Sequence, residues 1–308
     1  MIVGFLVVAV AAPIAGRVAV RLGVVDEPGP LKVHDRPVPY LGGLALLAGL
    51  VGPVAVGTPA LLIPLGLAAL LGLVDDVVPL SPRLRLACEA LVGVAAAAVV
   101  PGRGLLGAAV TIVVVIVLLN AVNLLDGLDG LASGVGAVSA LGFALALQGQ
   151  PRLLALALAG GLIGFLLWNR PPAHIYLGDA GSYLVGTALA LLLARSFGPG
   201  QPVALASGAV LFVAVPVADT AVALVRRHRA GRPLLLGDRG HVYDQLNDRG
   251  WGPLAATGAC IGAQAVLVVI GLGVNELPGP AAAAVVVALV VAVGAALLWT
   301  FTSPASWA

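Results

Sequence analysis

The stretch NAVNLLDGLDG, residues 120–130, decides how the rest of this chain is interpreted. It brings two amides and two carboxylates together directly after an apolar run, residues 108–119. A charged side chain at the centre of a bilayer costs roughly 2.5–3.5 kcal/mol even on the scale derived from insertion experiments. We therefore expect this cluster where a membrane helix meets water, in a place where its polar groups have a task.

The overall composition is that of a membrane protein. Of the 308 residues, 60% are hydrophobic and 10% are charged, and the mean hydropathy is +1.10. Soluble domains carry about 25% charged residues. Both cysteines, Cys88 and Cys260, lie in apolar runs without the spacing of a disulfide framework or a metal site. We predict one all-α polytopic integral membrane domain over residues 1–308, whose first apolar segment is a membrane helix rather than a signal peptide.

Apolar segments of membrane-crossing length follow one another along the chain. A membrane helix needs about 20 apolar residues, with a range of roughly 17–25. Breaks at proline, glycine and charge clusters leave about 10–11 transmembrane helices. The longest polar stretch, 226–253, is expected to be a cytoplasmic loop within the domain. The candidate spans are 2–22, 40–57, 59–74, 82–100, 104–122, 131–147, 153–168, 181–195, 203–225, 254–274 and 281–301.

The distribution of charge predicts which loops face the cytoplasm. Thirteen of the sixteen Lys and Arg residues fall in one set of alternate loops, and the other set holds only Arg103, Arg152 and Arg195. Basic loops stay in the cytoplasm. Of the acidic residues only Glu276 falls clearly in an outer loop, and all four histidines fall in inner loops. This segregation predicts a multi-pass plasma-membrane protein with its active site on the cytoplasmic face.

Three acidic motifs end or begin predicted spans on that face. Asp75 and Asp76 close the third span, and adjacent carboxylates usually have a cation or a basic partner. In the opening stretch Asn120, Asn123, Asp126 and Asp129 recur every three residues, and the two Asp-Gly pairs weaken the helix there. Asp179 lies between two glycines in GDAGS. Each motif alone also fits a solvated or capped helix end.

Basic residues and two buried acids complete the constellation. Lys32 and His34 lie in the first inner loop, and Arg239 and His241 lie in the last one. Positive-inside topology alone would account for part of this set. Glu89 and Asp219 fall inside spans; Arg85, one turn away, is a partner for Glu89, whereas Asp219 has no evident partner in the sequence.

Carboxylates and amides beside cationic loops suit a phosphorylated substrate held through a divalent cation. Mg²⁺ prefers oxygen ligands and normally combines one or two carboxylates with phosphates and waters. Basic side chains would neutralise the remaining phosphate charge. The chain has no GxxxxGK[ST], HExxH or GxSxG motif, which excludes the corresponding nucleotidases and hydrolases.

These residues resemble the polyprenyl-phosphate N-acetylhexosamine-1-phosphate transferases, also called glycosyltransferase family 4. The resemblance covers nearly the whole chain and rests on five ordered motifs. They are KxHxxPxPxxGG at residues 32–43, the aspartate pair 75–76, NxxNxxDG at 120–127, GDxGS at 178–182, and DRxH at 238–241. The reaction that this resemblance implies transfers N-acetylhexosamine-1-phosphate from a UDP-sugar to undecaprenyl or decaprenyl phosphate, releasing UMP.

The resemblance also implies roles for individual residues. Asp179 and Asn123 would bind Mg²⁺, with Mn²⁺ as a substitute. Asp75 would orient or deprotonate the lipid phosphate, with support from Asp76, so that Asp75, Asp76 and Asp179 form the catalytic set. The other candidates would bind substrate: Lys32, His34, Asn120, Asp126, Asp129, Arg239 and His241. A homodimer is expected from the resemblance alone, and a nucleic acid partner is not expected.

One departure from the family pattern bears on the sugar. Relatives often carry an HxHH or HHH run in the last inner loop, whereas this chain reads His241-Val242-Tyr243-Asp244. The single histidine favours the N-acetylglucosamine branch over the phospho-MurNAc-pentapeptide transferases, which remain the alternative. A nucleotide-sugar or lipid transporter is a further alternative, but transporters place their sites near the midplane. The CDP-alcohol phosphotransferases are disfavoured, because no Arg or acid follows Asp129-Gly130 at their spacing.

Overall fold

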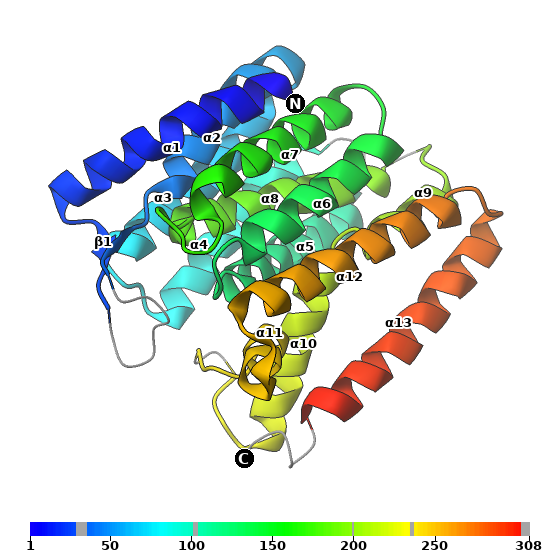
Figure 1. The fold of residues 1–308 in the computed structure, drawn as a ribbon. Helices are drawn as coiled ribbons and strands as arrows, with labels where there is room; N and C mark the ends of the chain where they lie inside the picture. Colours follow the sequence, from blue (N-terminus) through cyan, green and yellow to red (C-terminus); the bar gives the residue numbers. More distant parts are fainter. Residues whose placement is uncertain (29–35, 101–103, 199, 235–236, 303–308) are drawn as a thin grey trace.

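The computed structural model describes residues 1–28, 36–100, 104–198, 200–234 and 237–302, and over these it is a helical bundle with one two-residue strand pair (Figure 1). The all-α prediction is therefore confirmed. The helices are α1 (Ile2–Leu22), α2 (Gly42–Gly57), η1 (Pro59–Leu61), α3 (Leu62–Val77), α4 (Pro82–Val99), α5 (Gly104–Leu125), α6 (Leu131–Ala146), α7 (Gln150–Asn169), α8 (Gly178–Ser196), α9 (Val203–Leu211), α10 (Ala214–Arg229), α11 (Val242–Leu246), η2 (Asn247–Trp251), α12 (Pro253–Val274) and α13 (Gly279–Thr302). The strands are β1 (Val25–Asp26) and β2 (Val38–Pro39), paired antiparallel.

Nine of the eleven predicted spans correspond to one helix each, and the spans 59–74 and 203–225 each correspond to two consecutive helices. Six described helices are long and apolar enough to cross a membrane, and there are seven if the pair α9 and α10, bent by 60°, forms one span. The shorter α2 and α6 have 16 residues each. α4 and α8 carry ionisable residues within the helix. The number of complete crossings, ten or eleven, stays a prediction.

Helix α8 forms the centre of the bundle and is buried almost from end to end. It packs against α3 and α5, while α1 lies at one edge and α13 at the other (Figure 1). Helices in lipid gain little from hydrophobic burial against one another, so small residues that allow close approach hold them together. A Cβ added at Gly43 would meet the backbone of Gly181, and one added at Gly72 would meet the backbone of Asp179.

The two Asp-Gly pairs end a helix, as predicted. α5 stops at Leu125, and α6 begins at Leu131 after Gly130, which adopts φ +74. The predicted N-cap of α4 is also present, because Ser81 Oγ accepts from the backbone N–H of Leu84 at 3.4 Å with Pro82 at the first helical position.

The helix ends that carry the acidic motifs meet at one end of the bundle. One cavity is lined from the strand pair, the end of α3, the α5–α6 turn, the start of α8 and the loop before α11. Glu276, the acid predicted to lie in an outer loop, is in the connection between α12 and α13, at the end of the bundle opposite the cavity. The predicted segregation of acids is thus present in the fold, among the described residues.

Candidate active site

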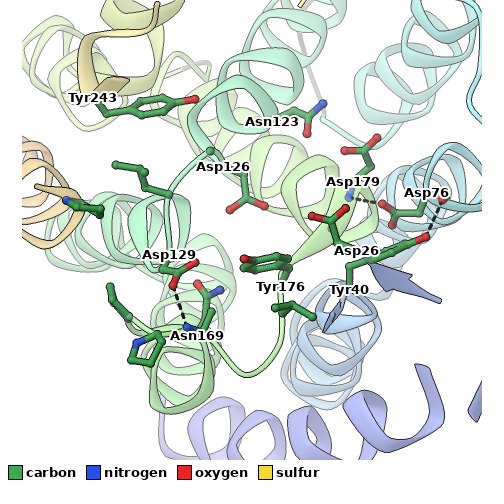
Figure 2. Close-up of a pocket in the computed structure, with 18 of the residues that line it drawn as sticks. Asp26, Tyr40, Asp76, Asn123, Asp126, Asp129, Asn169, Tyr176, Asp179 and Tyr243 are labelled. Carbon is green, nitrogen blue, oxygen red and sulfur yellow. Dashed lines mark hydrogen bonds between the residues drawn. The ribbon is translucent and has the colours of Figure 1, made fainter. Parts of the chain in front are cut away.

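A cavity of about 850 Å³ occupies this end of the bundle. Figure 2 shows the side chains of Asp26, Asp126 and Asp179 converging on one space from three different elements. Sites for cofactors and nucleotide-sized ligands typically enclose roughly 300–1,000 Å³. The seven predicted site residues that line this cavity are Asp75, Asp76, Asn123, Asp126, Asp129, Asp179 and Arg239.

Four predicted residues are not among them. Lys32 and His34 lie outside the described residues. Asn120 and His241 are described, but neither borders the cavity. The predicted role of Asn120 and His241 in binding substrate therefore has no support from their position. Each side chain instead contacts a buried carboxylate, Glu89 for Asn120 and Asp219 for His241.

Asp76 holds the start of α8. Its two carboxylate oxygens accept from the backbone N–H groups of Asp179 at 2.9 Å and Ala180 at 3.1 Å. The first N–H groups of a helix lack intrahelical partners, and the helix dipole favours a negative charge there. Gly178, at φ +71, makes the tight turn into the helix. Asp76 thus positions Asp179, and this bond lies between residues 103 apart in sequence.

Asp75 is fixed by two hydrogen bonds and has an arginine nearby. Its carboxylate accepts from the Tyr183 hydroxyl at 2.7 Å and from Leu80 N–H at 2.8 Å, and Arg85 Nη1 lies 3.7 Å away. The side chain is nearly buried. Asp75 is therefore an oriented carboxyl group at the cavity wall rather than a solvated helix-end acid.

Asn120 belongs to a buried network behind that wall. Its Nδ2 donates to Glu89 Oε2 at 2.6 Å and to Ile116 O at 2.9 Å. Glu89 is 1% exposed, and Arg85 Nε lies 3.6 Å from its other oxygen, as the sequence predicted. A buried carboxylate requires donors, so Asn120 faces α4 instead of the cavity.

Asn123 lies beside the start of α8. Ser182 Oγ donates to Asn123 Oδ1 at 2.9 Å, and this same hydroxyl lies 3.2 Å from the main-chain oxygen of Asp179. Both Asn123 and Asp179 border the cavity. The two residues predicted to share a cation are thus joined through one serine.

The turn between α5 and α6 carries Asp126 and Asp129. Asp129 Oδ2 accepts from Ala173 N–H at 2.8 Å, which ties the turn to the segment before α8. Asn169 also fixes the turn, accepting from Gly130 N–H at 3.2 Å. Among the described residues no hydrogen bond or ion pair reaches the Asp126 carboxylate, which lies in the cavity (Figure 2).

The charge around Asp126 disfavours ionisation. Burial raises the pKa of Asp126 well above its usual range, and the nearby carboxylates of Asp179, Asp76 and Asp129 raise it further. A cluster that crowds carboxylates without neutralising them is suited to a cation. Within the described residues no three His, Cys, Asp or Glu side chains could hold a metal ion by themselves.

Asp238, which follows α10 in the sequence, is bound by two arginines of that helix. Arg226 Nη2 and Arg227 Nη2 lie 2.6 Å and 2.9 Å from its two oxygens. Burial alone would raise the pKa of Asp238, but the hydrogen bonds and charges of the two arginines outweigh it and lower the pKa. The next residue, Arg239, borders the cavity. Its Nε is 3.7 Å from Asp244, so the guanidinium is only loosely paired.

His241 is buried against Asp219, the acid for which the sequence offered no partner. Its Nδ1 lies 2.6 Å from Asp219 Oδ2, and Val242 N–H donates to Asp219 Oδ1 at 2.7 Å. The imidazole stacks on Tyr243, whose hydroxyl donates to Leu124 O and whose ring lines the cavity. His241 therefore supports Tyr243 from behind.

Several lining residues were not predicted. Asp26, Tyr40, Asn169, Tyr176 and Tyr243 all border the cavity. Tyr243 follows His241 of the DRxH motif by two residues, Tyr176 precedes the GDxGS motif by two residues, and Tyr40 lies at a variable position of the KxHxxPxPxxGG motif. Asp26 comes from the segment before the first inner loop, and its place at the cavity depends on the pairing of β1 with β2.

Comparison with known proteins identifies the family. The glycosyl transferase family 4 model matches residues 58–196. A Streptomyces coelicolor protein named as a glycosyltransferase is 37% identical over 291 residues, covering 87% of this chain and 67% of the relative. The chain belongs to glycosyl transferase family 4.

Two further relatives of this family 4 chain carry more specific names. The probable undecaprenyl-phosphate N-acetylglucosaminyl 1-phosphate transferase of Bacillus subtilis is 32% identical over 274 residues, covering 80% of this chain and 75% of the relative. The decaprenyl-phosphate N-acetylglucosaminephosphotransferase of Mycolicibacterium smegmatis is 30% identical over 282 residues, covering 74% and 70%. The predicted family is confirmed, and both names agree with the N-acetylglucosamine branch expected from the single histidine at position 241.

Proposed function

We propose that this protein transfers N-acetylglucosamine-1-phosphate from UDP-N-acetylglucosamine to polyprenyl phosphate at the cytoplasmic face of the plasma membrane. The observation that carries the proposal is the carboxylate-lined cavity at the ends of membrane helices, in a chain whose relatives bear the names of such transferases. A site at the ends of membrane helices would lie near the lipid headgroups, where the phosphate of the lipid acceptor can meet a soluble nucleotide sugar.

The donor set of the cavity fits Mg²⁺. Asp179 and Asn123 supply oxygen atoms beside the helix start, and Asp126 adds a carboxylate to which no described residue is hydrogen-bonded. Mg²⁺ uses few protein carboxylates and completes its shell with phosphate oxygens and waters. The cation would neutralise the diphosphate of the donor, and Mn²⁺ prefers similar oxygen ligands.

The protein's own groups would then position the two phosphates. An oxygen of the lipid phosphate attacks the β-phosphorus of the UDP-sugar, the bond from that phosphorus to the bridging oxygen breaks, and UMP leaves. Asp75, held by Tyr183 and Arg85, would orient the lipid phosphate and take its remaining proton where it carries one. Arg239 would neutralise charge on the leaving UMP. One phosphoanhydride replaces another, so positioning and charge neutralisation supply most of the catalysis.

The alternatives differ in what they would transfer or move. A phospho-MurNAc-pentapeptide transferase would use the same chemistry on a peptide-bearing sugar, and the lone His241 disfavours that branch. A transporter would carry the nucleotide sugar unchanged, and the position of the cavity at one end of the bundle disfavours it.

The deciding experiment incubates the purified protein with polyprenyl phosphate, Mg²⁺ and one UDP-sugar at a time. We expect UMP and a lipid diphosphate-sugar in equal amounts from UDP-N-acetylglucosamine, and no product after chelation by EDTA. The D179N variant should give none with or without added Mg²⁺. Product from UDP-MurNAc-pentapeptide alone would assign the chain to the other branch, and nucleotide-sugar uptake into vesicles without UMP release would refute the proposal.

A further inference from the structure

A second hollow, of about 550 Å³, lies between α1, β2 and the segment from the end of α7 to the start of α8, outside the proposed catalytic cavity. Its floor is apolar and is formed by Pro13, Trp168 and Ile175. Its rim carries three groups that donate to anions, Arg17, Arg21 and His174. α1 lies at the edge of the bundle (Figure 1). We therefore expect the groove along this helix to be accessible from the surrounding lipid.

The three rim side chains have no ion pair or hydrogen bond within the described part of the chain. Arg17 and Arg21 stand one helical turn apart, where like charges repel. Other arginines at the same end of the bundle differ: Arg85 reaches two carboxylates, and Arg226 and Arg227 share Asp238. The groove thus concentrates unneutralised positive charge beside an apolar floor.

A thin wall separates this groove from the catalytic cavity. Tyr176 N–H donates to Pro39 O at 2.8 Å, which joins the segment before α8 to β2. Neighbouring residues of these two segments face opposite ways: Pro39 and Ile175 line the groove, whereas Tyr40 and Tyr176 line the cavity. An occupant of the groove would therefore support the wall of the cavity without entering it.

We propose that this groove binds an anionic glycerophospholipid of the surrounding membrane. The phosphate would lie on Arg17, Arg21 and His174, and the first part of an acyl chain would cover Pro13, Trp168 and Ile175. A soluble anion would leave the apolar floor exposed to water, and a zwitterionic lipid would compensate less of the charge. The polyprenyl phosphate acceptor fits less well, because its phosphate would be held across the wall from Asp75.

Quenching of Trp168 by brominated lipids tests this assignment. The full-length protein in phosphatidylcholine micelles is titrated with phosphatidylglycerol whose acyl chains are brominated, and separately with brominated phosphatidylcholine. Subtracting the W168F signal isolates Trp168 from the other tryptophans. We expect half-quenching at a phosphatidylglycerol fraction about tenfold lower than for phosphatidylcholine, from the attraction of basic residues to anionic lipid.

Three variants test whether the preference for phosphatidylglycerol over phosphatidylcholine arises in this groove. R17Q/R21Q should abolish it, whereas R83Q, at an exposed arginine of α4 at the same end, should leave it intact. G16L should block both lipids, because a Cβ at Gly16 would already contact Pro39 and Ile175 across the groove. Equal quenching by the two lipids, or a preference that survives R17Q/R21Q, overturns the proposal. Displacement of brominated phosphatidylglycerol by stoichiometric polyprenyl phosphate would assign the groove to the acceptor and would also overturn it.

Discussion

The neighbouring carboxylates Asp75 and Asp76 have separate tasks because α3 directs them to different partners. Both carboxylate oxygens of Asp76 accept hydrogen bonds from backbone N–H groups of α8, whereas Asp75 accepts from a tyrosine hydroxyl and lies near Arg85. The bonds of Asp76 fix the start of α8, whereas Asp75, among the described residues, makes no hydrogen bond to the α8 backbone. Of the pair, Asp75 is therefore the residue proposed to act on the lipid phosphate.

Replacing Asp75 by Asn should reduce turnover by about 10²–10⁴-fold, the range for loss of a general acid–base group. The single Asn oxygen can still accept from Leu80 N–H, and the amide NH2 can donate to the Tyr183 hydroxyl, which reverses that hydrogen bond. Because the shape of the side chain is kept, we expect the local fold to be retained. Steady-state kinetics and calorimetric titration with UDP-N-acetylglucosamine separate chemistry from binding. Y183F, which keeps the charge and removes one hydrogen bond, should lose much less activity. Loss of nucleotide-sugar binding in D75N would contradict the assigned role.

Asp238 is predicted to stabilise the basic loop through charge. D238N leaves the buried guanidinium groups of Arg226 and Arg227 without an anion, and we expect a loss of about 1–3 kcal/mol at pH 7. Because the folded-state pKa of Asp238 is lowered, its contribution is present above the unfolded pKa and is lost as pH falls through the folded one.

Thermal unfolding in detergent between pH 7 and pH 3 measures both effects. The difference between wild type and D238N should be largest at neutral pH and should shrink in acid. R232Q is the matched control, since Arg232 is 61% exposed and 3.6 Å from the same carboxylate, and surface pairs contribute roughly 0–1 kcal/mol. An equal loss in R232Q would mean that the loop responds to net charge alone.

At the scale of elements, the site depends on how closely helices approach one another. α3 delivers Asp75 and Asp76 to the start of α8 because Gly72 leaves room for the α8 backbone. The turn after α5 is held from behind by Tyr243, whose ring occupies the space that a side chain at Gly127 would need. The glycines at these contacts are therefore needed to bring the candidate site residues together.

Changing Gly72 to Ala should therefore push α3 away from α8 and disturb the Asp76 cap. We expect a lower midpoint of thermal unfolding together with a loss of activity. G66A is the control on the same helix, because no atom lies within 4 Å of a Cβ there. Alanine is favoured over glycine in a helix by about 1 kcal/mol, so G66A should be neutral or stabilising. A tolerated G72A would show that the contact is not required.

The Asp219–His241 pair links α10 to α11 and so positions Tyr243. D219N keeps the acceptor for Val242 N–H but removes the charge that orients the imidazole. We expect a raised KM for the UDP-sugar with a smaller change in kcat. The D219A variant, which lacks the acceptor as well, should be further impaired. Unchanged kinetics in both D219N and D219A would show that the Asp219–His241 contact does not influence substrate binding in the cavity.

At the scale of the whole molecule, one end of the bundle holds the candidate active site, and the described residues of the other end include few charged side chains. We expect the charged end to face the cytoplasm. In a chain whose Cys88 and Cys260 are replaced by Ala, E276C should react with a membrane-impermeant maleimide in intact cells. D248C, exposed at the opposite end, should react only after permeabilisation. The reverse pattern would invert the proposed topology. The homodimer expected from family resemblance stays a prediction.

The sequence by itself determined the helices and the set of polar groups that share a face. Hydrophobic length, Asp-Gly breaks and Ser81-Pro82 act locally, and in lipid each helix must satisfy its own backbone. The segregation of charge along the chain therefore predicted where Asp75, Asp126 and Asp179 would meet. Local signals also paired Arg85 with Glu89, since one helical turn joins them.

Only the tertiary structure decided what each polar residue contacts. Asn120 and Asn123 are one turn apart on α5, yet one satisfies the buried Glu89 and the other borders the cavity. His241 belongs to the DRxH motif that the sequence assigned to substrate binding, but it is buried against Asp219, 22 residues away in the sequence. The physical reason is that a buried charge must find donors wherever packing brings them, and packing joins segments whose separation in sequence carries no signal.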